Sequence, residues 1–298
     1  MESSASDSNS KAKFSTRLKK KLKEYIFVLL IAVFAALFLK TFFIEAYKIP
    51  TASMKDTLLE GDFIVVNKLL YGANTPVKFP LFGFTIPPLD MPGFKEPERN
   101  EIIVFKFPGN RDEIVAKEEI NYIKRIIGLP GDTIKIVRKQ VFINDQQHQE
   151  VNTIRLNNSK EGKLFNEENN IFPLGKNWNE DNYGPVIVPK KGMKVLLDLF
   201  NINDWKTIIE RDAGKRCIEI KNGNVLIHNE FVNEYIFKND YFFVLGDNRD
   251  DSLDSRFWGF VSRDLIVGRA ELIYWSVEDE LNSSLIPVRW NRILNFIK

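Results

Sequence analysis

The chain is poor in the residues that form disulfide bonds and metal centres. Its 298 residues include one cysteine, Cys217, and two histidines, His148 and His228. A single cysteine excludes an intrachain disulfide, and neither histidine stands in a cluster with the spacing of metal ligands. Cys217 lies in a Cys-Ile-Glu-Ile strand pattern and is expected to be a buried, inert thiol. The sequence therefore predicts no metal site.

An excess of one charge is also missing from most of the chain. The net charge at pH 7 is +2, from 42 Lys and Arg against 40 Asp and Glu. The chain thus lacks the basic excess of many nucleic-acid-binding proteins, and we expect no nucleic-acid partner. Residues 1–24 are the exception, and we interpret them as a basic tail. Their basic residues are Lys11, Lys13, Arg17, Lys19, Lys20, Lys21 and Lys23.

One long apolar run follows this tail. Tyr25 to Leu39 is uncharged, and Thr41 to Ile44 continues the run past Lys40. About 20 such residues are enough for a helix to cross the ~30 Å hydrocarbon core of a bilayer. We therefore predict a transmembrane helix over 25–44, with Lys40 extending its ammonium group to the interface. Because basic residues precede it, 1–24 are expected in the cytoplasm and the remaining chain on the extracytoplasmic, periplasmic side.

A cleaved secretory signal is the alternative interpretation of the same run. The run is long for the apolar region of such a signal. It continues into Tyr47-Lys48-Ile49-Pro50 without a clear small-residue cleavage site. These features favour a permanent single-pass anchor.

Short strand patterns dominate residues 45–298. Two pairs of strands are close enough to form hairpins, and the second pair has Asn222-Gly223 as its turn. The predicted fold class is mainly β: an N-terminal transmembrane helix followed by an antiparallel β core. The segments with strand character are 62–67, 101–106, 133–137, 141–143, 217–220, 225–228, 241–245 and 271–275.

Residues 146–215 differ from the segments on either side. They are rich in Asn, Lys and Glu, and hydrophobic alternation is poor. A short helix is expected from a cap at Asn203 to residue 211, with Trp205, Ile208 and Ile209 on its apolar face. We interpret 146–239 as a subdomain inserted into a core formed by residues 45–145 and 240–298.

Residues 72–97 combine six prolines with many large apolar side chains. One interpretation is a loop that packs on the core. The other is an apolar surface that dips into the bilayer beside the anchor. Both interpretations stay open at the level of sequence.

Two residues suggest nucleophilic chemistry. Ser53 follows the apolar run so closely that even an extended chain keeps it within roughly 30 Å of the end of the helix. Lys124 stands among isoleucines, and burial there would lower its pKa until the neutral amine could accept the serine proton. The alternatives are that Lys124 points outward from a strand, or that His148 or His228 forms a triad with a carboxylate.

The segment Gly246–Arg256 has two interpretations. Its three spaced aspartates could hold a cation, but an EF-hand needs a different spacing and a terminal Glu. The two arginines between them would rather neutralise the carboxylates. We favour a loop of ion pairs and hydrogen bonds that presents Ser252 or Ser255 to Lys124. The charged residues in question are Asp247, Arg249, Asp250, Asp254 and Arg256.

Together these segments resemble the bacterial type I signal peptidase family, serine proteases with a Ser–Lys dyad. The most specific motif runs from Gly246-Asp247-Asn248-Arg249-Asp250 through Asp254-Ser255-Arg256-Phe257-Trp258-Gly259. A second is Lys124-Arg125 followed by Gly128-Leu129-Pro130-Gly131-Asp132. The resemblance extends from the anchor to the Val288–Arg292 tail, and its middle is similar to larger members with a β-rich cap domain.

The resemblance implies an endopeptidase that removes N-terminal signal peptides from exported preproteins without a cofactor. Ser53 would be the nucleophile and Lys124 the general base. The Ser53 N–H and the Thr51 hydroxyl would stabilise the oxyanion, each donor being typically worth about 3 kcal/mol. The implied location is the cytoplasmic (inner) membrane, with phospholipid as a partner and the secretion translocon nearby.

The resemblance also assigns supporting roles. Ser252 would orient Lys124, and Asp254 would pair with Arg256 to hold the loop. Shallow pockets would take small side chains at the −1 and −3 positions of the preprotein. The residues lining them would be Tyr47, Ile49, Tyr122 and Ile123.

Two departures from the family pattern flank the nucleophile. The family often has Ser-Gly-Ser-Met followed by Pro-Thr-Leu, whereas this chain has Thr51-Ala52-Ser53-Met54 followed by Lys55-Asp56-Thr57-Leu58. Ala52 and Asp56 leave the rate and the side-chain preference open. A processing peptidase with a narrow substrate and an inactive membrane-anchored paralogue that acts as a binding protein are therefore alternatives.

Overall fold

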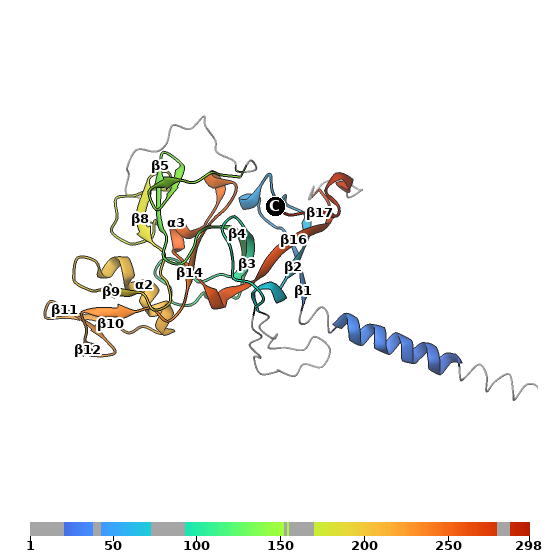
Figure 1. Ribbon diagram of the computed structural model, residues 1–298, viewed down its shortest axis with the longest axis horizontal. Coiled ribbons are helices and arrows are strands. Elements are labelled where there is room, and N and C mark those ends of the chain that lie inside the picture. The colour runs from blue at the N-terminus through green and yellow to red at the C-terminus, as the bar shows by residue number, and fades with distance from the viewer. Residues whose placement is uncertain (1–20, 38–42, 73–92, 152–153, 155–169, 279–286) are drawn as a thin grey trace, which may run out of the picture.

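The computed structural model describes residues 21–37, 43–72, 93–151, 154, 170–278 and 287–298 (Figure 1). Most of the proline-rich segment predicted over 72–97 lies outside the described residues. Both interpretations of that segment therefore stay predictions.

The central element is an eight-stranded antiparallel sheet, which confirms the mainly β prediction (Figure 1). Its strands follow the order β1-β2-β16-β3-β4-β14-β15, and β17 pairs with β16. β-branched and aromatic residues fill these strands, as their preference for pleated, half-buried surfaces predicts. The strands are β1 (Ile44–Lys48), β2 (Asp62–Asn67), β3 (Ile102–Lys106), β4 (Asn121–Gly128), β14 (Tyr241–Leu245), β15 (Val261–Ser262), β16 (Ile266–Ser276) and β17 (Asn295–Phe296).

The large sheet is strongly curved. Three strands separate β1 from β4, and four inter-strand spacings would place them about 19 Å apart in a flat sheet. Nevertheless the side-chain amide of Asn121 in β4 donates a hydrogen bond of 3.1 Å to the hydroxyl of Tyr47 in β1. Register shifts in the pairing of β16 with β2 and β3 accompany the curvature. The curvature therefore brings β1, the first strand of the sheet in the sequence, next to β4.

Three smaller sheets and a helix lie at the end of the molecule away from β1 (Figure 1). A four-stranded sheet has the order β7-β6-β5-β8, a three-stranded sheet the order β10-β11-β12, and β13 pairs with β9. Their bounds are β5 (Thr133–Val137), β6 (Gln140–Ile143), β7 (Gln146–Gln147), β8 (Tyr183–Ile187), β9 (Lys194–Leu196), β10 (Ile218–Lys221), β11 (Asn224–Ile227), β12 (Glu230–Phe231) and β13 (Glu234–Ile236).

The four-stranded sheet joins residues from both sides of the boundary predicted at 145/146. β5 pairs with β6 on one side and with β8, from the predicted insert, on the other. One apolar cluster also contains Ile134 of β5, Ile208 of the insert and Phe243 of β14. The insert and the core are thus continuous in packing, and the cap subdomain stays a prediction.

Both predicted hairpins are confirmed. β5 and β6 form the first, and β10 and β11 form the second. Asn222 and Gly223 have φ values of 50° and 76°, the left-handed conformation of a tight hairpin turn. Local alternation was sufficient to define the first hairpin, and alternation together with the Asn-Gly turn defined the second.

The predicted helix begins earlier than expected. Helix α2 spans Ile202–Ala213, and Asn201 rather than Asn203 occupies the capping position. Asn201 and Asp198 bond each other's backbone and so fix the turn before the helix. Ile208 and Ile209 are fully buried, as their spacing predicted.

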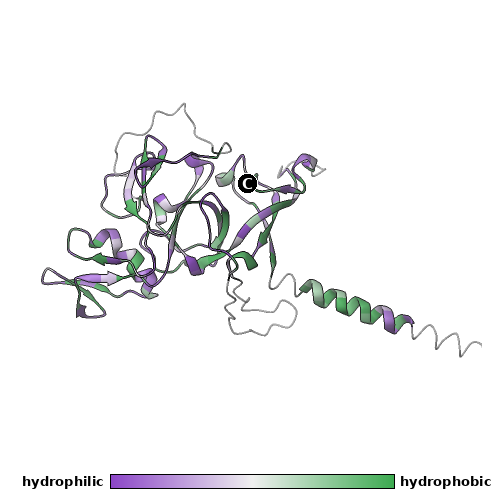
Figure 2. Cartoon of the chain, viewed as in Figure 1, coloured by the Kyte–Doolittle hydropathy of each residue, from purple (hydrophilic) through white to green (hydrophobic). Residues whose placement is uncertain are grey.

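A separate helix covers residues 21–37, and it projects from the β body (Figure 1). In Figure 2 most of this helix has the colour of hydrophobic residues, and Phe27 and Leu30 are more than 60% exposed. Among the described residues, no helix is both long enough and apolar enough to cross a membrane. The span predicted over 25–44 includes residues 38–42, which lie outside the described residues, and it stays a prediction.

Candidate active site

Ser53 lies on a tight turn between β1 and β2. Thr51 is extended, and Ala52–Met54 form a single 3-10 turn. Met54 and Leu58 are fully buried and anchor the turn, and the Leu58 N–H bonds the Met54 carbonyl at 2.7 Å. The buried side chains of Met54 and Leu58 therefore fix the turn, while Ser53 of the same turn lines a cleft.

Lys124 lies on β4 and faces the same cleft. Its side chain is only 4% exposed, and its Nζ lies 2.7 Å from Ser53 Oγ. Burial lowers the pKa of Lys124 to about 8, because removal from water disfavours the ammonium. The carboxylates of Asp254 and Asp247 act in the opposite direction but are outweighed. Lys124 therefore does not point outward from the strand, which was one alternative left open by the sequence; its side chain is buried beside Ser53.

The two nearby carboxylates are engaged with arginines. Asp254 is completely buried and accepts hydrogen bonds of 2.8 and 2.9 Å from the guanidinium of Arg256. Asp247 accepts hydrogen bonds of 2.8 and 2.6 Å from Arg125, the residue after the lysine. Because both charges are already neutralised, they compensate the buried lysine only weakly.

The loop after β14 is an ion-pair loop rather than a cation site. Asp250 pairs with Lys139 at 2.8 Å, so each of the three spaced aspartates has a different cationic partner. Within the described residues, no group of His, Cys, Asp and Glu could hold a metal ion. Ser255, one of the two hydroxyls considered for Lys124, accepts instead from the Val244 N–H at 2.9 Å.

Asn248 connects this loop to the turn that carries Ser53. Its N–H donates to the Ser53 carbonyl at 3.0 Å, and its side-chain amide donates to the Ala52 carbonyl at 3.1 Å. Sequence reasoning assigned no role to Asn248. Its place inside the Gly-Asp-Asn motif was the signal that could have identified it.

Ser252 lines the cleft but makes no hydrogen bond to Lys124. Its Oγ is buried without a hydrogen-bond partner within the described residues, although the resemblance implied a bond to the lysine. The Lys124 ammonium donates instead to Ser53, and Ser252 itself is in an extended conformation at the end of a 3-10 turn.

The cleft has a volume of about 640 Å³. Among the residues assigned a role by the resemblance, Thr51, Tyr122 and Ile123 line it, and sequence reasoning did not name several other lining residues. Those additional lining residues include Glu60, Ile120, Asn121, Asp251 and Leu253.

Two of the residues expected to line pockets lie elsewhere. Ile49 is 2% exposed and packs in an apolar cluster under the cleft, because its backbone is fixed by hydrogen bonds to Asp62 and Gly61. Tyr47 does not line the cleft but contacts it through Asn121. Burial and the hydroxyl's neighbour Glu45 raise the pKa of Tyr47, so it stays protonated.

Tyr122 adds an aromatic contact to the lysine. Its ring centroid is 5.7 Å from Lys124 Nζ, and the ring stacks on Phe107 with centroids 4.6 Å apart. The ring therefore lies beside the end of the lysine side chain, at the distance of a cation–π contact.

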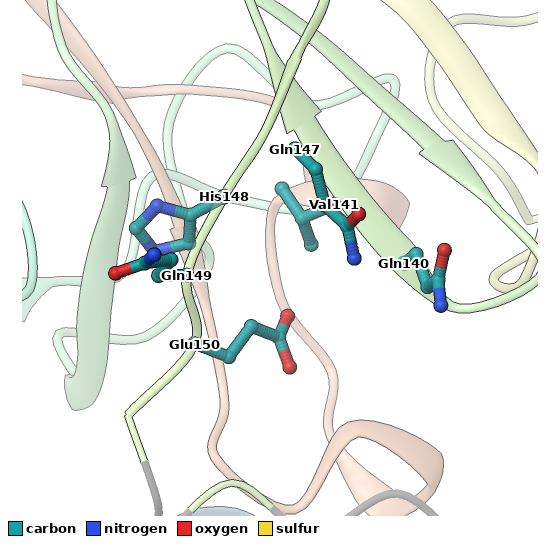
Figure 3. Close-up of a pocket in the computed structure, with 6 residues that line it drawn as sticks. All are labelled: Gln140, Val141, Gln147, His148, Gln149 and Glu150. Carbon is teal, nitrogen blue, oxygen red and sulfur yellow. The ribbon is translucent and has the colours of Figure 1, made fainter.

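His148 lies away from the serine. A ring nitrogen of His148 lies 3.0 Å from the Asn100 side-chain oxygen, and burial together with Arg99 and Arg249 lowers the pKa of His148. Figure 3 shows His148 beside Gln149 and Glu150 in a separate cavity of about 760 Å³. None of the residues that line this cavity lines the cleft around Ser53. His148 is thus not placed to act as the base.

Comparison with known proteins agrees with this geometry. The family model "Signal peptidase, peptidase S26" matches residues 22–275. The chain belongs to this signal peptidase family. It is therefore a serine endopeptidase of the signal peptidase I type, as the sequence motifs predicted.

Signal peptidase I sequences match along most of the chain. The protein from Aquifex aeolicus is 32% identical over 86% of this chain and 85% of its own length. The protein from Buchnera aphidicola subsp. Schizaphis graminum is 34% identical over 88% of this chain and 78% of its own. A solved signal peptidase I from Enterococcus faecalis V583 is 21% identical, covers 59% of this chain and 97% of its own, and has a TM-score of 0.27. The family assignment rests on the family model and the sequence relatives.

Proposed function

We propose that this signal peptidase family member is a membrane-anchored endopeptidase that removes N-terminal signal peptides from exported preproteins after small residues. Ser53 is the nucleophile and Lys124 the general base. The observation that carries the proposal is the 2.7 Å contact between Ser53 Oγ and a buried lysine whose pKa is about 8. A serine needs such an adjacent base to become a nucleophile near neutral pH.

The geometry supports a two-step acyl transfer. Neutral Lys124 accepts the proton of Ser53 as Oγ attacks the carbonyl carbon of the scissile bond. The resulting ammonium then gives that proton to the departing amine, leaving a Ser53 acyl-enzyme. Lys124, neutral again, accepts a proton from water, which attacks the ester. The ammonium then gives this proton to Ser53 Oγ as the acyl bond breaks, and the signal peptide leaves with a free carboxylate. Each proton is thus returned, and no cofactor takes part.

Thr51 is proposed to share the oxyanion with the Ser53 N–H. Thr51 lies on the rim of the cleft, two residues before the nucleophile, and is extended. Donors aimed at the developing negative charge typically contribute about 3 kcal/mol each to transition-state stabilisation.

A specificity for small residues agrees with the floor of the cleft. Tyr122 and Ile123 line it directly, while Tyr47 and Ile49 are proposed to support it from beneath. Bulky side chains at the −1 and −3 positions would meet a floor that is already packed. The preproteins that carry signal peptides are therefore the proposed partners.

The membrane anchor is proposed over residues 25–44. Its support is the uncharged run after a basic tail and the exposed apolar surface of the helix over 21–37. β1 begins at Ile44 and ends shortly before Ser53, so the site would lie close to the membrane. The proposed location is the cytoplasmic (inner) membrane, single-pass, with the N-terminus cytoplasmic and the β body periplasmic beside phospholipid and the translocon.

A narrow-substrate processing peptidase is the second candidate, favoured only by Ala52 and Asp56 beside the nucleophile. Asp56 has a φ of 81°, in the left-handed region that a non-glycine residue rarely adopts, so this turn carries a local strain. An inactive binding paralogue is disfavoured, because the serine and the lysine are both present and in contact.

The deciding experiment is cleavage of several purified preproteins by the full chain in detergent. Wild type should release the signal peptide with a new N-terminus after a small residue, identified by sequencing. Ser53→Ala and Lys124→Met should be inactive though folded. Ser262→Ala and Lys194→Met are matched controls outside the cleft and should stay active. Cleavage of a single substrate would favour the narrow peptidase, and no cleavage by wild type would contradict the proposal.

A further inference from the structure

The four-stranded sheet contacts the loop beside the nucleophile through two ion pairs on consecutive residues. Lys139 Nζ lies 2.8 Å from Asp250 Oδ1. The Arg249 guanidinium lies 2.5 Å from Glu150 Oε1. Lys139 stands at the turn between β5 and β6, and Glu150 follows β7. Two separate segments of this sheet therefore hold one short turn.

The other side of the same turn holds the nucleophile. Asn248, the residue before Arg249, bonds the carbonyls of Ser53 and Ala52. Asp250 lines the cleft. Residues 248–250 thus form a bridge with the nucleophile turn on one side and the four-stranded sheet on the other.

Both pairs are sheltered from water. The Lys139 and Asp250 side chains are 11% and 19% exposed, and those of Arg249 and Glu150 are 4% and 18% exposed. Ion pairs at such depth are screened less than surface pairs and hold their geometry more firmly. They are suited to fixing the position of a loop.

The turn that presents Lys139 is held in an unusual backbone conformation. Arg138 and Lys139 have φ values of 49° and 69°, in the left-handed region that glycine and asparagine normally occupy in hairpin turns. Hydrogen bonds from the Lys139 N–H to the Asp181 carbonyl and from the Arg138 N–H to the Asn182 side chain maintain it. Lys139 therefore occupies a backbone position where the conformation by itself favours glycine or asparagine.

We propose that Lys139 and Glu150 are positioning residues for catalysis: through Asp250 and Arg249 they hold the 248–252 turn, and with it Ser53, in the active arrangement. The four-stranded sheet is then part of the catalytic apparatus rather than an appendage. Neither residue lines the cleft, so neither touches substrate directly. The inference rests on the proposed Ser53–Lys124 chemistry.

The test compares kcat, KM, the pH profile and the melting temperature of full-length variants in detergent. Lys139→Met should lower kcat about 10-fold with KM within about two-fold, because small displacements of reacting groups reduce rate more than binding. Glu150→Gln should act in the same direction, and Lys139→Arg should restore most of the rate. Lys194→Met, which breaks the 3.0 Å pair with Glu234 away from the loop, is the matched control.

The pH profile separates positioning from general stability. If the turn loosens, water reaches Lys124 and the midpoint of its titration moves to higher pH. The charged groups around Lys124, which are Asp247, Asp254 and Arg256, are unchanged in these variants. A purely structural role would lower the melting temperature without moving this midpoint.

Two results would overturn the inference while leaving the proposed function intact. In the first, wild type cleaves preprotein and both Lys139→Met and Glu150→Gln keep its kcat and its pH midpoint. In the second, activity falls only in proportion to the loss of folded protein, with an unmoved midpoint. Failure of wild type itself to cleave would instead remove the proposed function and the inference together.

Discussion

Lys124 Nζ lies 2.7 Å from Ser53 Oγ, although 71 residues separate the two in the chain. The curvature of the large sheet creates this contact, since it brings β4 against the turn between β1 and β2. Burial removes most of the lysine from water, and arginines already occupy the two nearest carboxylates. The contact therefore combines proximity with a lowered proton affinity, the two properties that a general base requires.

The first prediction concerns the pH dependence of cleavage. The base must be neutral to accept the serine proton, so kcat/KM should rise with pH through the Lys124 pKa of about 8. The expected profile is a tenfold increase per pH unit below the midpoint and a plateau above it. Initial rates on one preprotein across the pH range would measure it.

His148→Gln is the control for this profile. The pKa of His148 is lowered from its ordinary value, so its titration cannot produce a rise near pH 8. The variant should show the same rise of kcat/KM with pH as the wild type. If this rise disappears in His148→Gln, Lys124 is not the base.

The second prediction is that Lys124, the proposed base, destabilises the fold. Its pKa is 10.5 when unfolded and about 8 when folded, so at pH 7 the folded protein carries a buried ammonium at a cost of about 3 kcal/mol. Lys124→Met should abolish cleavage and raise the free energy of unfolding, by about 1–3 kcal/mol once the lost bond to Ser53 is deducted.

The lowered pKa of Lys124 determines the pH range over which the lysine changes the stability of the fold. Between pH 8 and 10.5 the unfolded lysine binds the proton more than the folded one, so the stability of the wild type rises with pH there. The advantage of Lys124→Met should shrink across that window and vanish above it. Urea unfolding of both proteins at pH 7 and pH 10.5 would test this, and an equal difference at both pH values would disprove it.

Local sequence patterns were sufficient for much of the fold. The hairpin around Asn222 follows from alternation and turn chemistry, and the hairpin around Arg138 follows from alternation alone; both signals depend on neighbours in the chain. The orientation of Lys124 could not be predicted this way, because β4 is buried on both faces from Lys124 to Gly128 and shows no alternation there. Whether a residue in such a strand faces a core or a cleft depends on what packs against it.

Contacts between segments distant in the chain explain the other differences between the sequence predictions and the structure. β8 pairs with β5 across a long insertion, a contact that neither segment encodes locally, so the predicted boundary at 145/146 divides a sheet. Ile49 was assigned to a pocket by resemblance, but its neighbours in space bury it. The ion-pair loop was predictable in outline, since its acidic and basic residues alternate, whereas the partners Lys139 and Glu150 come from distant segments.

The third prediction concerns the Arg125–Asp247 pair. Both side chains are 1% exposed, and Asp247 also accepts a 2.5 Å hydrogen bond from the Thr57 hydroxyl. Asp247→Asn leaves a buried guanidinium unpaired, which should lower the free energy of unfolding by about 3–5 kcal/mol. Cleavage should fall as well, since Thr57 ends the turn that carries Ser53.

Asp112→Asn is the matched control for this pair. Asp112 bonds Arg111 at 2.7 Å, but its side chain is 60% exposed. Its removal should change the free energy of unfolding by less than about 1 kcal/mol. If the denaturant midpoint shifts equally in the two variants, burial does not determine how much the Arg125–Asp247 pair contributes to stability.

The fourth prediction tests how closely the loop approaches the nucleophile. A Cβ added at Gly246 would lie 2.2 Å from Ser252 Oγ and 2.6 Å from the Ser53 carbonyl oxygen. The backbone must move to admit it, so Gly246→Ala should lower kcat by about 100-fold. Gly268→Ala provides the comparison, because its Cβ would meet the Asn67 carbonyl oxygen at 2.4 Å within the sheet, away from the cleft. That variant should lose stability yet retain kcat per folded molecule. If Gly246→Ala instead cleaves preprotein at the wild-type rate, the contact between this loop and Ser53 is not required for catalysis.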